Sequence, residues 1–163
     1  MKKEVVIWIG AGEIGLAIIR RIGTGKYILV ADKNLEKAQS IAALLERVGF
    51  DAIALRTDLS SRNSILSVID EALKYGEIKY LVNSAGVSPS QASIETILKV
   101  DLYGTAVLLE EVGKVIAPGG SGVTISSQSG HRMPALSPEI DELLATTPSE
   151  DLLNLEVLQK GNI

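Results

Sequence analysis

A glycine-rich turn between residues 10 and 15 constrains the fold of this chain more than any other feature. The stretch "GAGEIG" places Gly10, Gly12 and Gly15 in G-x-G-x-x-G spacing, between the apolar run "EVVIWI" and a helical pattern in "LAIIRRIG". Such a turn lets the backbone approach a pyrophosphate, and the helix N-terminus offers it free N–H groups and a positive dipole end. The candidate cofactor contacts at this turn are Gly10, Gly12, Glu13, Ile14 and Gly15.

An acidic residue follows the turn at a distance that suits the ribose of a dinucleotide. Asp32 closes the second apolar run, "YILVAD", near the spacing of about 20 residues that the fingerprint expects. A carboxylate there accepts hydrogen bonds from the two ribose hydroxyls of adenosine and repels a 2′-phosphate. The pattern therefore favours NAD over NADP, although Lys33 is suited to pair with a phosphate. The alternative interpretation is that Asp32 caps the following helix.

Two further strand ends carry acidic or small residues. Asp58 and Leu59 lie in "TDL", where the carboxylate is suited either to accept from the adenine amino group or to cap the next helix. Asn83, Ala85 and Gly86 lie in "NSAG". Small residues there let a cofactor lie across the strand ends, in the crevice where the strand order reverses. Taken alone, "NSAG" is more typical of an ordinary strand-to-helix turn.

Short apolar strands alternate with helices as far as residue 127. We expect strands near residues 4–10, 27–32, 51–58, 79–86 and 122–127, and helices over 13–23, 34–49, 61–76 and 91–116, the last one bent near Asp101. Only 4% of the residues are aromatic, so aliphatic residues must form most of the core, although Trp8 is expected to pack there too. The predicted fold class is α/β, a Rossmann-type doubly wound parallel sheet of about five strands.

The segment after Gly130 shows no strand pattern. The stretch "SPEIDELLATTPSEDLLNL" contains two short helical patterns, each begun by a Ser-Pro or Pro-Ser pair. We therefore expect a dinucleotide-binding domain over residues 1–130 and a helical excursion from the sheet over residues 131–163.

The motifs "GAGEIG", "AD", "TDL", "NSAG" and "ISSQSG" occur in an order that resembles the short-chain dehydrogenase/reductase family as far as Gly130. The resemblance implies a strand order of 3-2-1-4-5-6-7, with the nicotinamide bound across the strand ends. It also implies that Ser127 hydrogen-bonds the substrate oxygen while a tyrosinate moves the proton. Asp101 stands where the family usually has an asparagine that supports a helix bend and a proton-relay water. Its carboxylate keeps the acceptor function and lacks the amide donor.

The chain departs from the family pattern in two places. Its glycine turn is closer to the shorter dinucleotide fingerprint, with Glu13 where the family has its penultimate glycine. The family's Tyr-x-x-x-Lys motif is missing after Ser127; the tyrosine that has a lysine four residues on, Tyr75, lies far before the serine, beside a helix-closing glycine. We therefore expect an N-terminal portion of a family member that is inactive as it stands. His131 is interpreted as a substrate-side or exposed residue rather than a base for Ser127.

A sheet that stops at its fifth strand presents an open edge. We expect this edge, and the face of the helix over residues 102–116, to be covered in a homo-oligomer or by the tail of the chain. The formal net charge of −4 and the pI near 5.1 argue against a nucleic-acid or anionic-membrane partner. The lack of cysteine excludes disulfides and thiolate metal sites; no metal site is predicted, and a cytoplasmic location is expected.

The expected function is oxidation or reduction of a small alcohol or ketone with NAD, with NADP less favoured. Two alternatives stay open at this point. One is a non-catalytic, NAD-binding regulatory module with the same glycine turn and Asp32. The other is a methyltransferase that uses S-adenosylmethionine, because such domains also combine a glycine loop with an acidic residue after the second strand.

Overall fold

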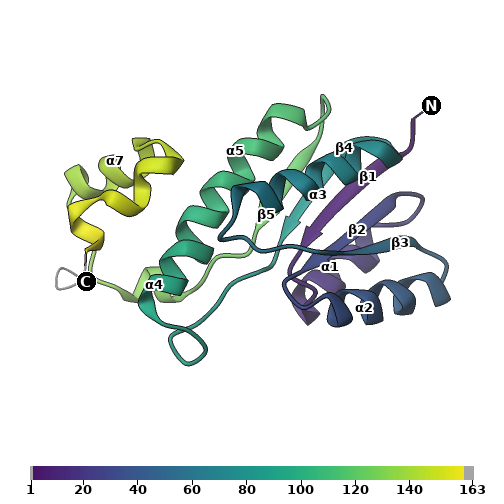
Figure 1. Cartoon of the computed structure of the whole chain (residues 1–163), viewed down its shortest axis with the longest axis horizontal. Helices are drawn as coiled ribbons and strands as arrows, with labels where there is room; N and C mark the ends of the chain where they lie inside the picture. Colours follow the sequence, from purple (N-terminus) through teal and green to yellow (C-terminus); the bar gives the residue numbers. More distant parts are fainter. Residues whose placement is uncertain (1, 160–163) are drawn as a thin grey trace. The chain divides into compact units, whose positions relative to one another are not determined.

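The computed structural model describes residues 2–159, which divide into two compact units, one ending at Ile125 and the other beginning at Ser126. The first unit is built on a five-stranded parallel sheet with the order β3-β2-β1-β4-β5 (Figure 1). Its strands are β1 (Glu4–Ile9), β2 (Tyr27–Asp32), β3 (Asp51–Arg56), β4 (Glu77–Asn83) and β5 (Ser121–Thr124). The predicted Rossmann-type α/β fold is thereby confirmed.

Helices cover both faces of the sheet in this unit. One face carries α1 (Glu13–Ile22) and α2 (Leu35–Arg47), and the other carries α3 (Arg62–Tyr75) and α5 (Thr105–Val115) (Figure 1). Local signals fix where these helices begin. The Asn34 side chain accepts from the backbone N–H of Lys37 at the start of α2, and Ser61 caps α3 in the same way by accepting from Ser64.

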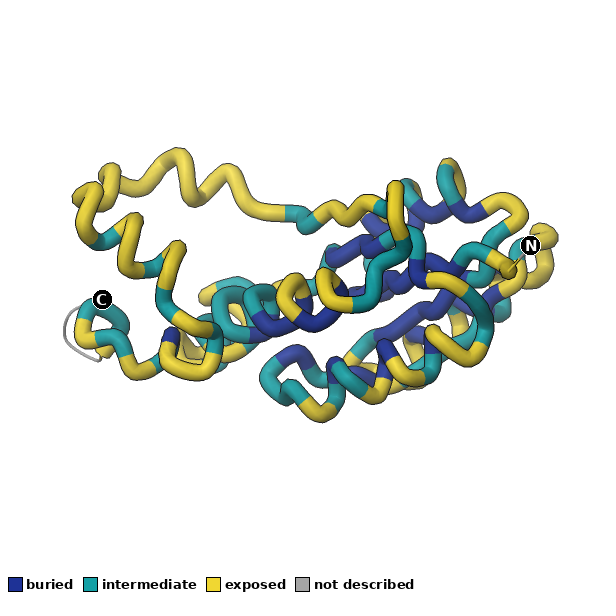
Figure 2. The backbone as a smooth tube through the Cα atoms, turned by 90° about the horizontal axis from the view of Figure 1, so that it is seen from above, coloured by how far each residue is buried: buried dark blue, intermediate teal, exposed yellow. Residues whose placement is uncertain are grey.

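The central strand β1 is buried on both faces. Val5, Ile7 and Ile9 point into the core under α3 and α5, whereas Val6 and Trp8 point into the core under α1 and α2. All five have relative exposures of 2% or less, and the buried residues of the unit gather in its interior (Figure 2), which β1 and β2 cross. A strand with two helix-covered faces needs a continuous apolar sequence rather than an alternating one, which is what "VVIWI" provides.

The helix predicted to bend near Asp101 is interrupted there. It begins as α4 (Ile94–Ile97), widens into the π-helical segment η1 (Leu98–Gly104) and continues as α5. A Cβ at Gly104 would lie 2.5 Å from the carbonyl oxygen of Leu59, so glycine lets η1 pack directly against the loop after β3. A π-helical segment is rare and often accompanies a functional site.

The regular elements of the second unit are all helices among the residues described, 126–159. The unit contains α6 (Ser129–Arg132), α7 (Pro138–Thr146) and the 3₁₀ segments η2 (Ser149–Asn154) and η3 (Glu156–Leu158). Ser137 caps α7 by accepting from the backbone N–H of Ile140 at 3.3 Å. Pro138 takes the first helical position, where its missing N–H costs nothing. The two predicted helical patterns therefore correspond to α7 and η2.

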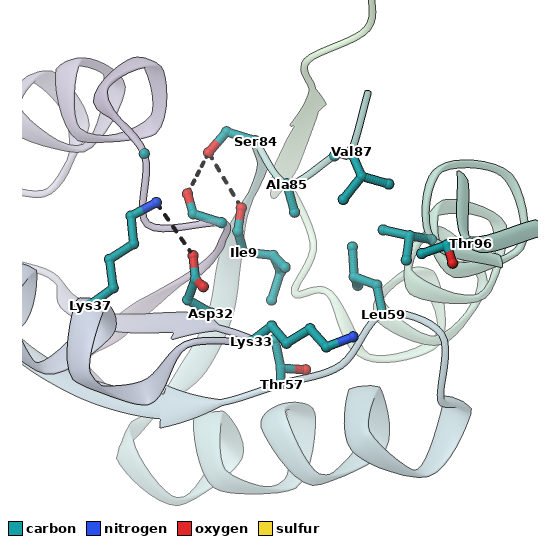
Figure 3. Close-up of a pocket in the computed structure, with 14 residues that line it drawn as sticks. Ile9, Asp32, Lys33, Lys37, Thr57, Leu59, Ser84, Ala85, Val87 and Thr96 are labelled. Atoms are coloured by element: carbon teal, nitrogen blue, oxygen red, sulfur yellow. Dashed lines mark hydrogen bonds and ion pairs between the residues drawn. The ribbon is translucent and has the colours of Figure 1, made fainter. Parts of the chain in front are cut away.

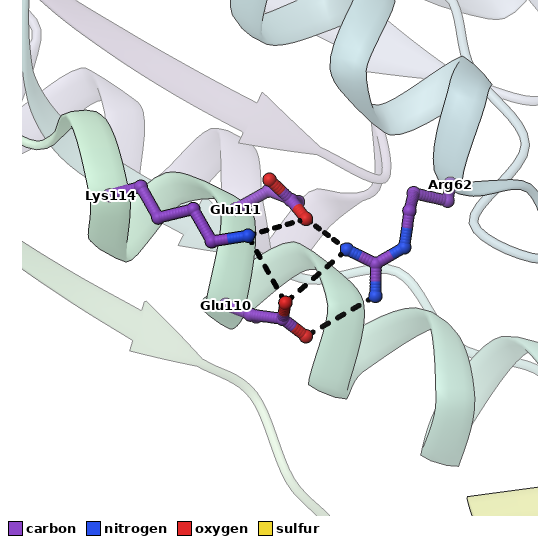
Figure 4. A network of polar contacts seen from close by, with 4 residues as sticks. All are labelled: Arg62, Glu110, Glu111 and Lys114. Atoms are coloured by element: carbon purple, nitrogen blue, oxygen red, sulfur yellow. Dashed lines mark hydrogen bonds and ion pairs between the residues drawn. The ribbon is translucent and has the colours of Figure 1, made fainter. Parts of the chain in front are cut away.

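A network of four charged side chains joins α3 to α5 (Figure 4). Arg62 of α3 contacts Glu111 through Nη1, and its Nη2 lies 3.2 Å from Oε2 of Glu110. Lys114 Nζ lies 2.9 Å from Glu111 Oε1 and 3.1 Å from Glu110 Oε1. The Glu111 side chain is only 10% exposed, so its charge depends on these two cations rather than on water.

Replacing Arg62 with alanine is expected to lower the free energy of unfolding by about 1–2 kcal/mol. The carboxylate of Glu111 is largely buried, and in the variant it is paired with Lys114 but no longer with Arg62. Urea denaturation followed by circular dichroism measures the loss. Lys74→Ala is the matched control, since Lys74 is 68% exposed in its pair with Glu71 and should cost less than about 0.5 kcal/mol. Equal losses in the two variants would contradict the assignment.

Candidate functional site

A cleft of about 280 Å³ opens at the carboxyl ends of the parallel strands (Figure 3). It lies where the chain order reverses, with β2 on one side of β1 and β4 on the other, which is where α/β sheets bind ligands. The lining residues come from the ends of β1 and β2, from the segments after the first four strands, and from α2, α4 and η1: Ile9, Gly10, Gly12, Asp32, Lys33, Lys37, Thr57, Leu59, Ser84, Ala85, Gly86, Val87, Thr96 and Val100.

The glycine turn forms one wall of this cleft. Gly10 has a φ of +85°, and a Cβ there would lie 2.5 Å from the backbone nitrogen of Ala85, so the turn passes tightly over the end of β4. Gly12 is different, because a Cβ there would meet nothing within 4 Å. Gly12 is also the N-cap of α1 and has no side chain to occupy the helix N-terminus. The space beside Gly12 is therefore open to an anionic group of a ligand.

The other predicted contacts of the turn lie outside the lining of the cleft. Gly15 is buried, and a Cβ there would lie 2.1 Å from Trp8 Nε1 and 2.4 Å from Ser84 Oγ. This glycine thus lets α1 pack closely on the sheet. Glu13 and Ile14 are exposed on the first turn of α1, Ile14 at 60%.

Asp32 joins the turn to the cleft. Its Oδ2 accepts from the backbone N–H of Ala11 at 2.8 Å, and its Oδ1 accepts from that of Asn34 at 2.9 Å. Lys37 Nζ lies 4.0 Å from the same Oδ2 (Figure 3). The carboxylate therefore organises two backbone segments and lines the cleft at the same time, while Asn34 rather than Asp32 caps α2.

Asp58 stands beside the cleft rather than in its lining. Its Oδ1 accepts from the Ser60 hydroxyl at 2.6 Å and from the Ser60 backbone N–H at 2.9 Å. The hydroxyl of Ser60, followed by its N–H and by Lys33, holds the pKa of Asp58 below its usual value despite partial burial. Lys33 Nζ lies 3.3 Å from Oδ2, so Asp58 anchors a lysine that does line the cleft. Its neighbour Leu59 also lines it.

The "NSAG" segment after β4 forms the wall opposite Asp32. Asn83 is fully buried, and its Oδ1 accepts from the backbone N–H of Ala85 at 3.3 Å. Ser84, Ala85 and Gly86 line the cleft, whereas Asn83 shapes the turn from beneath. The small side chains of Ala85 and Gly86 leave open space beside the strand ends, and a contact between them and a cofactor stays a prediction.

Asp101 holds the next part of this wall. Its two carboxylate oxygens lie 3.1 and 3.4 Å from the backbone nitrogen of Val87, which donates to them. Burial raises the pKa of Asp101, and the Val87 hydrogen bond opposes that rise. Asp101 therefore ties the π-helical segment to Val87, which lines the cleft, and its part in a proton relay stays a prediction.

Asp101→Asn is expected to stabilise the protein at neutral pH. Because the folded-state pKa of Asp101 is raised, the folded state binds its proton more tightly than the unfolded state, and the charged form lowers stability once the pH exceeds both pKa values. The asparagine oxygen still accepts from Val87. The gain in Tm should be about 2–4 °C at most at pH 7 and should vanish as the pH falls below the usual aspartate pKa. Thermal melts from pH 3 to 8 measure it; an equal gain at every pH would contradict this explanation.

Ser127 belongs to the second unit and is exposed. Its hydroxyl accepts from the backbone N–H of Ser129 at 3.1 Å at the start of α6. His131 lies in the same short helix and is exposed as well. The role predicted for Ser127 concerns a substrate and stays a prediction.

Seven residues of the lining were not predicted from the sequence: Ile9, Lys37, Thr57, Ser84, Val87, Thr96 and Val100. Two of them carried a usable signal. Lys37 lies three positions after the cap Asn34, on the helix turn nearest to Asp32, and Ser84 lies inside "NSAG" itself. The α4 and η1 residues carried none, because their position depends on how the interrupted helix passes over the strand ends.

The described residues offer neither a metal centre nor a membrane span. Residues 2–159 contain no group of three or more histidine, cysteine, aspartate or glutamate side chains arranged to hold a metal ion. None of the helices described has the length and apolar character needed to cross a membrane.

The fold and the cleft define a Rossmann-type domain of the kind that binds ligands at a topological switch point. The profile of the short chain dehydrogenase family matches residues 3–138. A short-chain dehydrogenase/reductase (bsc3) from Alternaria brassicicola is 37% identical over 98% of this chain and 59% of its own length. Carbonyl reductase [NADPH] 1 from Macaca fascicularis is 30% identical over 87% of this chain and 56% of its own length. The chain belongs to the short-chain dehydrogenase/reductase family.

Solved structures share the fold. A Serratia marcescens short-chain dehydrogenase/reductase (F98L/F202L mutant) superposes with a TM-score of 0.71 at 20% identity, covering 87% of this chain and 62% of its own. A short-chain dehydrogenase/reductase from Burkholderia phymatum, in complex with NAD, also has a TM-score of 0.71, at 23% identity, covering 84% of this chain and 52% of its own. The chain thus spans a little more than half the length of these relatives.

Proposed function

We propose that this chain binds NAD(H) in the cleft and is the cofactor-binding part of an oxidoreductase that acts on a small alcohol or ketone. One observation carries the proposal: Asp32 lines the cleft and accepts from Ala11 of the glycine turn at 2.8 Å. The phosphate-binding turn and the ribose-binding carboxylate therefore form one unit. Residues 1–130 form the cofactor-binding part, and residues 131–163 form a substrate-side segment.

The residues of the cleft fit the cofactor. The free amides at the start of α1 and the open space beside Gly12 suit the diphosphate. Asp32 suits the ribose hydroxyls of adenosine, and Ala85 and Gly86 leave room for the nicotinamide half. The cofactor, when bound, supplies the hydride acceptor or donor; the chain binds it, orients it and excludes water from one side of it.

The preference for NAD over NADP rests on the charge of Asp32, which repels a 2′-phosphate. Two lysines oppose that preference, since Lys33 and Lys37 both line the cleft near the carboxylate. Lys33 is already paired with Asp58 at 3.3 Å. We therefore propose NAD as the preferred cofactor, with NADP bound more weakly.

For substrate turnover, Ser127 is proposed to hydrogen-bond the substrate oxygen and Asp101 to support the bend over the strand ends. The 163-residue chain has no Tyr-x-x-x-Lys motif after Ser127. We accordingly propose that it binds the cofactor without turning substrate over.

Calorimetric titration with NAD, NADH, NADPH and S-adenosylmethionine tests the binding proposal, and a panel of alcohols and ketones tests turnover. We expect micromolar to millimolar binding of NAD(H), weaker binding of NADPH, and no NAD(H)-linked turnover. Binding of S-adenosylmethionine alone would support a methyltransferase instead and overturn the proposal. Robust turnover would refute the inactive state while leaving cofactor binding intact.

We further propose a cytoplasmic homo-oligomer. The edge strand β5 pairs only with β4 among the residues described, and Val123 on it is 42% exposed. Leu109 on α5 is 48% exposed, and exposed apolar groups of this kind favour association. Light scattering coupled to size exclusion distinguishes an oligomer from a monodisperse monomer, which would contradict this part of the proposal.

A further inference from the structure

Trp8 is buried directly beneath the glycine turn. Its relative exposure is 0%, and it is the only tryptophan of the chain. The indole Nε1 donates a hydrogen bond of 3.0 Å to the hydroxyl of Ser84. A buried indole N–H needs such a partner, but here the partner is a residue that lines the cleft. Trp8 therefore does more than fill space in the core.

The hydroxyl of Ser84 links the indole to the glycine turn. Ser84 Oγ lies 2.8 Å from the carbonyl oxygen of Gly10 and 3.3 Å from that of Ile9 (Figure 3). The Ile9 carbonyl already accepts from the Ser84 backbone N–H at 2.8 Å. A serine hydroxyl has one proton to donate, and since it accepts from Trp8, that proton points to the Gly10 carbonyl. The result is a series of two hydrogen bonds, from the indole to the hydroxyl and from the hydroxyl to the Gly10 carbonyl.

The Gly10 carbonyl is the group through which this series of hydrogen bonds acts on the glycine turn. The same oxygen accepts from the backbone N–H of Gly12 at 2.8 Å, and Gly12 is the N-cap of α1. Trp8 acts on α1 by packing as well, since a Cβ on Gly15 would lie 2.1 Å from its Nε1. The indole thus sets both the orientation of the Gly10–Gly12 turn and the closeness of α1 to the sheet.

We propose that Trp8, acting through Ser84, is the positioning residue for the diphosphate-binding turn of this domain. The inference rests on the proposed dinucleotide binding and deepens it. The hydrogen bond of the indole supports recognition of the diphosphate, whereas Asp32 on the neighbouring strand recognises adenosine.

Dissociation constants for ADP, NADH and adenosine, measured by NMR titration of the full chain, test the proposal. Trp8→Phe keeps an aromatic ring and removes the donor, and Ser84→Ala breaks the same series of hydrogen bonds while keeping the indole. Each is expected to weaken ADP and NADH binding about three- to tenfold, as loss of one hydrogen bond would, and to leave adenosine binding unchanged. The double variant should bind ADP and NADH no more weakly than the weaker-binding of the two single variants, because both substitutions break the same series of hydrogen bonds.

Tyr27→Phe is the matched control, since Tyr27 stacks on Tyr75 at the amino end of β2, far along the strand from the cleft. It should leave all three dissociation constants unchanged. Equal weakening of ADP and adenosine by Trp8→Phe, or no weakening by either variant, would overturn the positioning role. If Trp8→Phe does not fold, Ser84→Ala decides alone. Failure of the wild-type chain to bind any of the three ligands would instead refute the proposed function.

Discussion

Gly10→Ala is expected to abolish NAD(H) binding and to lower the free energy of unfolding by about 3 kcal/mol or more. At a φ of +85° an alanine costs about 1–2 kcal/mol relative to glycine. The added Cβ would also lie 2.5 Å from the Ala85 backbone nitrogen and 2.6 Å from its Cα. Backbone cannot rotate away as a flexible side chain can, so the turn must separate from the end of β4. Calorimetric titration with NADH and urea denaturation measure the two losses.

Gly12→Ala is the matched control for this prediction. Its φ is −102° and its Cβ would meet nothing within 4 Å, so the free energy of unfolding should fall by less than about 1 kcal/mol. The methyl group nevertheless projects into the space assigned to the diphosphate, and NADH binding should still be lost. If Gly12→Ala binds NADH as the wild type does, the diphosphate lies elsewhere.

Asp32→Asn is expected to raise the ratio of NADPH to NADH affinity about 100-fold. The substitution weakens the hydrogen bonds to the ribose hydroxyls, each worth about 1.5–3 kcal/mol when the acceptor is charged. It also removes the charge that repels a 2′-phosphate and leaves Lys37 without its carboxylate partner in the lining, while Lys33 stays paired with Asp58. The free energy of unfolding should fall by about 1 kcal/mol, because one amide oxygen cannot replace both carboxylate oxygens bonded to Ala11 and Asn34. Fluorescence titration with the two reduced cofactors measures the ratio.

Adding Lys37→Ala to Asp32→Asn identifies the partner of the phosphate. The double variant should lose most of the gain in NADPH affinity while its NADH affinity stays close to that of Asp32→Asn. If the single substitution leaves the ratio unchanged, the carboxylate does not contact the adenosine ribose and acts only on the turn.

The sequence predicted the parts of the site that depend on backbone geometry. The glycine spacing indicated a tight turn before α1, and in the structure the φ of Gly10 and the packing of Gly15 both require glycine. The apolar runs indicated strands covered on both faces, and β1 is buried on both. The bend near Asp101 was expected from a single residue of the family pattern, and the structure realises it as a π-helical segment.

The parts that the sequence did not predict depend on contacts between distant residues. Trp8 was expected to be a core residue only, because nothing in a single strand tells that its indole reaches Ser84, 76 positions away. Asp58 was expected either to contact adenine or to cap a helix. In the structure it accepts from Ser60 and anchors Lys33, a role that depends on two strand ends lying side by side.

The reversal of strand order that opens the cleft also exposes the newly synthesised chain to aggregation. β1 comes first along the chain and lies in the middle of the sheet, with β2 on one side and β4 on the other. Its pairing with β2 and the pairing of β2 with β3 are available once Arg56 has been synthesised, but its pairing with β4 must wait for Glu77–Asn83. Until then an apolar strand keeps one unpaired edge, which is a template for pairing with other chains. Non-local parallel pairing is slow, so the nascent half-sheet is exposed to aggregation until β4 has joined β1.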